Sequence, residues 1–95
     1  MNMEHIEITQ ATYEELAQAL AERCYHRDFL GGVLTVCQDE CVDVTLSFTI
    51  VIHHDKRDGH ITKITPVWWD CTTELDGEAV TNDFSFTELL NELFE

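Results

Sequence analysis

The chain has 95 residues, 44% of them hydrophobic, and its 19 Asp and Glu against five Lys and Arg give a formal net charge of −14. This length and apolar content predict a single domain over residues 1–95 with a hydrophobic core, not a disordered chain. The acidity excludes direct binding to nucleic acid and to anionic membrane surfaces, because both repel a negative protein. No apolar run approaches the ~20 residues that span a bilayer, and the first ten residues lack the basic residues of a signal peptide. We therefore expect a cytoplasmic protein with reduced thiols.

Two segments before residue 28 have regular patterns. Residues 5–9 alternate apolar and polar side chains, which predicts a short edge strand. Thr12 and Glu15 then have the spacing of a capping box, in which each side chain bonds the backbone N–H of the other residue. The apolar residues that follow recur at helical spacing and predict an amphipathic helix over 12–24. Its buried stripe is Tyr13, Leu16, Ala17, Leu20 and Cys24.

The middle of the chain predicts a set of antiparallel strands. Residues 28–37 form the first, and residues 41–54 alternate almost strictly between apolar and polar side chains, as in a sheet with one covered face. Asp58-Gly59 is a hairpin signal that leads into a return strand over 61–75, and Asp76-Gly77 leads into a short strand over 78–82. The apolar face of the 41–54 strand is Val42, Val44, Leu46, Phe48, Ile50 and Ile52.

The last segment predicts a second helix. Ser85 and Glu88 make another capping box, and Phe84 with Leu89 fits a hydrophobic staple. The expected buried stripe is Phe86, Leu89, Leu90, Leu93 and Phe94.

The resulting element order is (β)-α-β-β-β-(β)-α, which predicts an α+β protein. Two amphipathic helices must bury their stripes, and the sheet offers one apolar face. We therefore expect a two-layer sandwich: an antiparallel meander sheet of three to five strands with both helices on one face. Thr45, Ser47 and Thr49 then lie on the other face, which stays uncovered.

Trp68 and Trp69 are adjacent, so in a strand their side chains point to opposite faces of the sheet. A two-residue turn at Asp58-Gly59 places Phe48 opposite Trp69. A four-residue loop gives the same parity, whereas an odd loop reverses it. We therefore expect Trp69 in the core and Trp68 on the uncovered face. The same register puts Val67 opposite Ile50 and Cys71 opposite Leu46, both on the core side.

Trp68 is the candidate functional residue, because tryptophan is enriched at binding hot spots. The alternative is a structural tryptophan that lies over its neighbours, since single exposed apolar residues are normal. The predicted interaction site is Trp68 with Thr49 opposite it and with Val51, Ile64 and Pro66 on the same face.

Histidines and cysteines gather near two turns: His53, His54 and His60 near one, Cys37 and Cys41 around the other. The strand between these groups spans roughly 40 Å at about 3.3 Å per residue, whereas a zinc–ligand bond is only about 2.0–2.3 Å. The two groups therefore cannot share a metal ion. We expect no tightly held zinc and no other cofactor.

The remaining cysteine and enzyme signals are weak. A three-residue loop would place Cys37 opposite Cys41 on the uncovered face, with Asp39 and Glu40 raising the pKa of both thiols. Cys24 and Cys71 fall on apolar faces and are expected to be packing residues. No nucleophile–base motif or phosphate-binding glycine loop is present. Asp43, Asp70 and Glu74 gather on an open face that gives no cleft.

The sequence therefore predicts a small, acidic, non-catalytic interaction module. It would self-associate as a homodimer or bind another protein through the face around Trp68. An alternative is an acidic regulator that mimics nucleic acid and inhibits a DNA- or RNA-binding protein. A weaker alternative is a small enzyme or thiol redox protein.

Overall fold

The computed structural model describes residues 5–94 and contains seven secondary-structure elements. In chain order they are β1 (His5–Ile6), α1 (Gln10–Cys24), β2 (Phe29–Asp39), β3 (Val42–His54), β4 (Ile61–Leu75), β5 (Glu78–Asn82) and α2 (Phe86–Phe94). The predicted α+β class and element order are confirmed.

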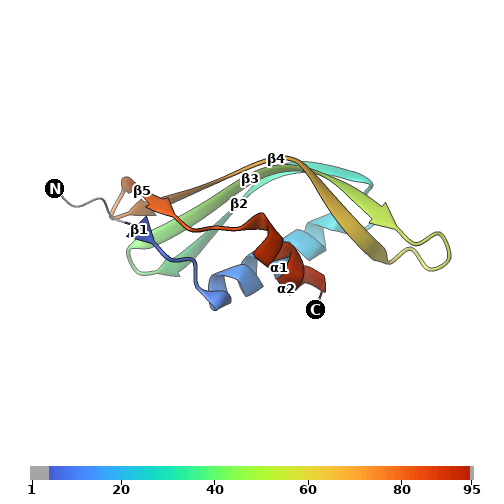
Figure 1. Ribbon diagram of the computed structural model, residues 1–95, viewed down its shortest axis with the longest axis horizontal. Coiled ribbons are helices and arrows are strands. Elements are labelled where there is room, and N and C mark those ends of the chain that lie inside the picture. Colours follow the sequence, from blue (N-terminus) through green and yellow to red (C-terminus); the bar gives the residue numbers. More distant parts are fainter. Residues whose placement is uncertain (1–4, 95) are drawn as a thin grey trace.

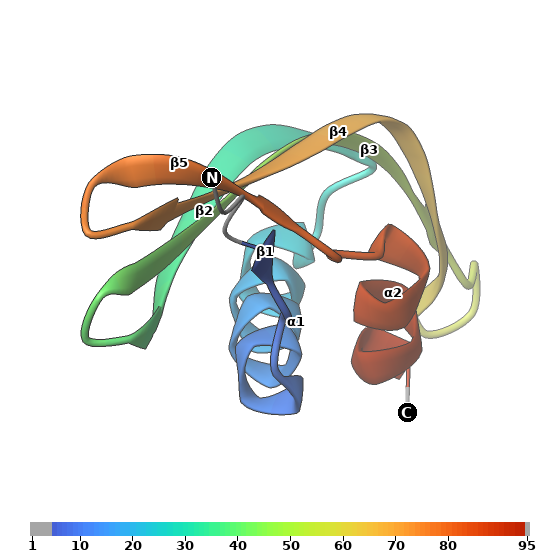
Figure 2. The same cartoon turned by 60° about the vertical axis from the view of Figure 1, so that its left-hand side comes forward.

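The sheet has five strands in the order β1-β5-β4-β3-β2, and both helices lie against one of its faces (Figures 1 and 2). The four strands from β2 to β5 form the predicted antiparallel meander, whereas β1 pairs in parallel with β5. The molecule is elongated, at 55 × 22 × 17 Å, because β3 and β4 are long. No helix within residues 5–94 has the length and apolar character needed to cross a membrane.

The core lies between the two layers, where the alternating apolar residues of β3 meet the helices. All six apolar side chains predicted on this strand are buried, as is the predicted stripe of α1. In α2, Phe86 and Leu89 are buried and Leu90 and Leu93 are partly buried. Phe94, which we expected in the stripe, is exposed, because it lies in the last turn of the short helix.

The N-terminus of α1 differs from the prediction. Thr9 caps the helix in place of Thr12, and its Oγ1 accepts a hydrogen bond from the Thr12 backbone N–H (3.2 Å). The Thr12 hydroxyl instead donates to Gln38 Oε1 (2.8 Å), which also accepts from the Thr9 backbone N–H (3.0 Å). The bonds to Gln38 come from β2, so no local spacing could reveal this part of the helix start. At α2 the predicted cap holds, with Ser85 Oγ accepting from the Glu88 backbone N–H (3.4 Å).

The β3–β4 register agrees with the prediction near the tryptophans and departs from it elsewhere. Phe48 lies opposite Trp69 and Thr49 opposite Trp68, as expected. Two irregularities follow toward the hairpin, one between Thr49 and Ile50 and one between His53 and His54, each leaving an extra residue in β4. Between them the pairing is shifted by one residue, which exchanges the faces of the β4 side chains.

Candidate interaction surface

The face of the sheet opposite the helices is uncovered, and we call it the open face (Figure 2). Side chains of β2, β3 and β4 that lie opposite one another form transverse rows across this face. The central row consists of Gly31, Thr49 and Trp68. On one side of it lies the row of Phe29, Val51 and Thr65, and on the other the row of Val33, Ser47 and Asp70.

An apolar patch occupies these three rows and consists of Phe29, Val33, Val51 and Trp68. Trp68 is 55% exposed, Phe29 58% and Val33 53%, while Val51 is half-buried between its neighbours. These four apolar side chains lie in neighbouring rows of three adjacent strands, so Trp68 is not an isolated exposed residue. Contiguous patches of this kind mark interaction sites more often than scattered apolar residues do.

The structure places the five residues of the predicted site on two different faces. Trp68, Thr49 and Val51 lie on the open face, as expected. Ile64 does not: it lies opposite Ile52, is only 3% exposed and belongs to the core. Pro66 lies opposite Ile50, so the pairing places it on the side of the sheet that carries the core. The prediction was wrong for these two residues because it assumed an unbroken register.

The irregularity beside Pro66 explains both errors. Val67 has no partner in β3 and is exposed, although we expected it in the core opposite Ile50. Proline cannot donate a ladder hydrogen bond, and within sheets it is tolerated mainly at edges and bulges. Pro66 lies in the interior of β4, which makes it the sequence signal that could have located the shift.

Sequence reasoning missed Phe29 and Val33 as members of the site. Leu34 is buried, and Leu30 and Val36 pack against the core. The residues between them must then face the other way. That alternation was a signal for Phe29 and Val33, but their distance from Trp68 depends on the pairing of β2 with β3.

Trp69 points to the helix side, as predicted, but the expectation that it lies in the core was wrong. Its ring contacts Phe84 (centroids 5.4 Å apart) and Phe86 (5.8 Å), and Phe84 stacks on Tyr13 (5.6 Å). These aromatic rings connect β4 to both helices. Trp69 nevertheless remains 39% exposed.

All four cysteines are free, and their environments oppose thiol chemistry. Burial raises the pKa of the Cys71 thiol to about 12, with Asp70 adding to the effect, and burial also raises the pKa of Cys24. For Cys41 a hydrogen bond with Asp76 is the main cause of a raised pKa. Partial desolvation, followed by the charge of Asp43, raises that of Cys37. A raised pKa lowers the thiolate fraction and hence the reactivity.

The predicted juxtaposition of Cys37 and Cys41 was wrong. Cys37 lies opposite Asp43, and Asp39 lies opposite Val42, with an irregularity between them at Gln38. Cys41 is therefore in the turn itself. Gln38 leaves the regular ladder to bond the start of α1, which is why the loop differs from the expected three-residue form.

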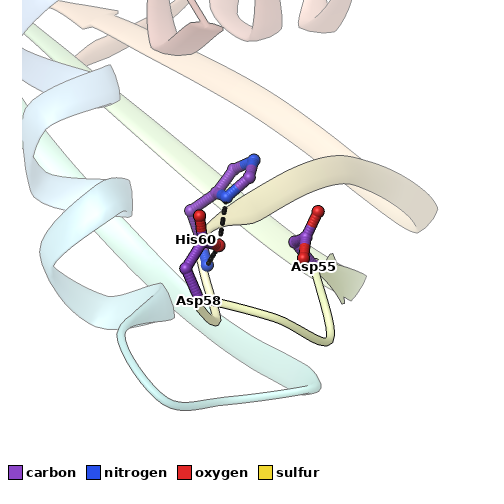
Figure 3. A group of neighbouring side chains, drawn as sticks. All are labelled: Asp55, Asp58 and His60. Atoms are coloured by element: carbon purple, nitrogen blue, oxygen red, sulfur yellow. Dashed lines mark hydrogen bonds and ion pairs between the residues drawn. The ribbon is translucent and has the colours of Figure 1, made fainter.

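The β3–β4 hairpin loop brings Asp55, Asp58 and His60 together, with one potential ligand atom of each within 4.8 Å of the others (Figure 3). Asp55 accepts a hydrogen bond from the Arg57 backbone N–H (2.7 Å), and Asp58 accepts one from the His60 backbone N–H (3.0 Å) and contacts its ring. These bonds from His60 lower the pKa of Asp58. Both carboxylates thus hold the shape of an exposed turn, and the expectation of no tightly held zinc stays a prediction.

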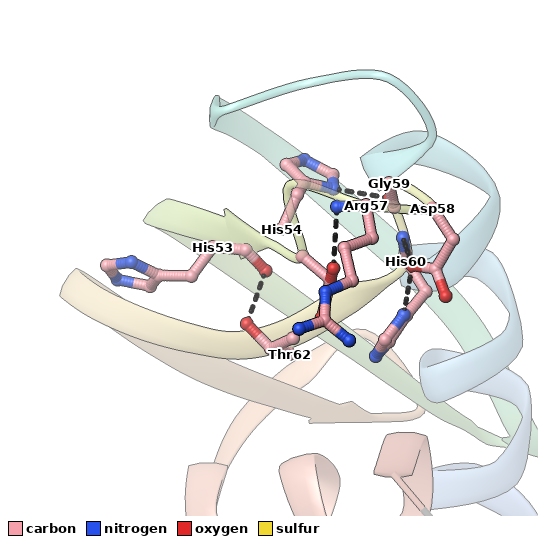
Figure 4. A network of polar contacts seen from close by, with 8 residues as sticks. His53, His54, Arg57, Asp58, Gly59, His60 and Thr62 are labelled. Atoms are coloured by element: carbon pink, nitrogen blue, oxygen red, sulfur yellow. Dashed lines mark hydrogen bonds and ion pairs between the residues drawn. The ribbon is translucent and has the colours of Figure 1, made fainter.

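His54 bonds the Gly59 carbonyl of this hairpin (Figure 4) and also contacts the loop that follows α1. Its Nδ1 lies 3.0 Å from the Gly59 carbonyl oxygen, and its Nε2 contacts the Arg27 carbonyl oxygen. Both partners are acceptors, so the ring can donate to both only when it is protonated. The Arg27 contact, followed by the Gly59 contact, raises the pKa of His54.

A cavity of about 350 Å³ lies beside His54, between the hairpin loop and the C-terminus of α1. Its wall combines histidines with an aromatic ring, but it contains no nucleophile beside a base and no cluster of buried acids. It is lined by Tyr25, His26, His54, Asp58, Gly59, His60 and Ile61. Asp43, Asp70 and Glu74 are exposed on the open face, outside this cavity.

No family model, curated protein or solved structure matches this chain.

Proposed function

We propose that this protein is a small, acidic, non-catalytic interaction module that associates with a second copy of itself through the apolar patch of the open face. The observation that supports the proposal is the exposure of Trp68, Phe29 and Val33 in three neighbouring rows of one uncovered sheet face. Apolar surface left in water costs about 25 cal/mol per Å². Burying the patch against its own symmetry mate recovers that cost, and two-fold dimers are the commonest soluble oligomers.

The dimensions of the molecule suit such a contact. A stable interface covers about 800 Å² of each partner, and the broad face of a 55 × 22 × 17 Å molecule can supply it. Two open sheets would pack as the layers of a β-sandwich about 10 Å apart. We place this module in the cytoplasm, where its exposed Cys37 and Cys41 thiols would stay reduced.

Sedimentation of the parent chain, Trp68→Ala and a control tests the proposal. Truncating a hot-spot residue costs about 2 kcal/mol or more, which corresponds to about 30-fold in the dimer dissociation constant. We expect at least that loss for Trp68→Ala. Phe94→Ala is the matched control, because Phe94 is another exposed aromatic residue (46%) that lies on α2, away from the open face. It should leave association unchanged.

Salt dependence provides a second measurement. The net charge of −14 on each copy opposes association, and salt screens this repulsion. The parent dimer should therefore tighten as salt is raised. A parent that is monomeric at every salt and protein concentration contradicts the proposal. The nucleic-acid mimic, by contrast, predicts such a monomer together with binding to a basic protein that Trp68→Ala leaves unchanged.

A further inference from the structure

The charged side chains are distributed unequally along the strand direction. One end of the sheet, which we call the acidic end, comprises the β2–β3 turn, the β4–β5 turn and the adjacent strand residues (Figure 1). It carries six carboxylates and no Lys or Arg in residues 38–43 and 74–78. The carboxylates are Asp39, Glu40, Asp43, Glu74, Asp76 and Glu78.

The opposite end, which we call the basic tip, is the β3–β4 hairpin with Lys56, Arg57 and Lys63. These are three of the five Lys and Arg in the chain. The two ion pairs found within residues 5–94 involve histidines, so none of the three cations has a carboxylate partner there. The hairpin's own Asp55 and Asp58 bond backbone N–H groups of the turn. The cations are thus available to a second molecule.

We propose that the two copies associate with their strands running in opposite directions, so that the basic tip of each lies over the acidic end of the other. This inference rests on the proposed self-association and specifies its geometry. Two open faces can meet about a two-fold axis that runs either along the strands or across them. An axis along the strands would place six carboxylates over six carboxylates, and like charges in contact cost several kcal/mol. An axis across the strands pairs opposite charges instead.

The apolar patch fits the same axis independently of charge. The patch is centred on the row of Gly31, Thr49 and Trp68. An axis across the strands through this row brings each Trp68 against the Trp68 of the other copy. It also exchanges the neighbouring rows, so that Phe29 of each copy lies over Val33 of the other. An axis along β3 would instead lay β2 over β4, with Phe29 over Thr65 and Val33 over Asp70.

An axis across the strands brings Lys63 of each copy close to two carboxylates of the other. Lys63 pairs with His53, which is four residues from Thr49 toward the basic tip. Thr72 pairs with Thr45, which is four residues from Thr49 toward the acidic end. Lys63 of one copy therefore lies over Thr72 of the other, between Asp70 and Glu74, which flank Thr72 on the same face of β4. A lysine side chain is long enough to reach either carboxylate across sheets about 10 Å apart.

Charge reversal tests this arrangement by sedimentation at low salt. Each substitution acts twice in a symmetric dimer, so Lys63→Glu and Glu74→Lys should each weaken association about five- to tenfold. The double variant Lys63→Glu/Glu74→Lys restores opposite charges and should regain most of the loss. Glu74→Lys is the decisive variant, because it makes each chain less negative. If overall repulsion alone governed association, it would tighten the dimer.

The outcomes separate this inference from the proposed function. A monomeric parent, or a dimer that Trp68→Ala does not weaken, refutes the self-association and the arrangement with it. If Trp68→Ala weakens the dimer but Glu74→Lys tightens it, or the double variant shows no recovery, the reversed arrangement is wrong and the self-association stands. Thermal unfolding of each variant shows whether a loss reflects the contact or the fold.

Discussion

Replacing Trp68 and Trp69 by alanine one at a time separates the two faces of the sheet by their effects on stability. Both side chains are large and partly exposed, so neither can be assigned a role from exposure alone. Trp69 contacts the aromatic rings of Phe84 and Phe86, whereas Trp68 lies opposite Thr49 on the open face. We expect Trp69→Ala to lower the free energy of unfolding of the monomer more than Trp68→Ala does.

The difference follows from burial and ring contacts. Trp69 is 39% exposed and Trp68 is 55% exposed. For a side chain of up to ~250 Å², this is about 40 Å² more burial for Trp69, or about 1 kcal/mol. The contacts with Phe84 and Phe86 add about 0.5–1.5 kcal/mol each. Trp69→Ala should therefore cost about 2–4 kcal/mol more than Trp68→Ala, and such differences are better determined than absolute values.

The measurement is denaturant unfolding at a protein concentration low enough for the parent to be monomeric, because association would stabilise the parent further. The slopes of the unfolding curves should agree among the three chains. If the two variants differ by less than about 0.5 kcal/mol, the aromatic contacts of Trp69 do not stabilise the fold.

Three further predictions concern the core, a helix cap and the hairpin. Phe48→Ala removes a ring that is 2% exposed between the layers and should cost about 3–5 kcal/mol in denaturant unfolding; a loss below 1 kcal/mol would mean that the site collapses around the cavity. Thr9→Ala should cost about 1 kcal/mol, because the first turn of α1 loses its capping oxygen; equal stability of variant and parent would contradict the assigned cap. Contacts with two carbonyl oxygens raise the pKa of His54 above its unfolded-state pKa of 6.5. The protonated ring therefore stabilises the fold fully below pH 6.5, and this contribution is lost as pH rises through the raised folded-state pKa. A pH series of melting temperatures should show that loss in the parent and not in His54→Gln, and identical profiles would exclude the effect.

Local patterns in the sequence determined most of the fold. The strict alternation in β3 and the helical spacing in α1 each define one apolar face, and two such helices with one such sheet leave few ways to bury them. Asp76-Gly77 was also sufficient for its turn, because the positive φ angles of 53° and 84° are those a tight hairpin requires. The predicted register also placed Trp68 opposite Thr49, but the expected two-residue turn at Asp58-Gly59 was wrong: the loop covers residues 55–60, and the two extra residues of β4 offset the difference.

The tertiary structure alone decided where the register shifts and which residues therefore share a face. Each irregularity in β4 exchanges the two faces, and that is why Ile64 is in the core and Val67 is exposed. Gln38 likewise bonds Thr9 and Thr12 at the start of α1 although it is far from them in the chain. The open-face patch combines Trp68 with Phe29 and Val33 because β2 and β4 both pair with β3. Patterns within a segment specify which side chains are buried, whereas contacts between distant segments specify which exposed side chains become neighbours.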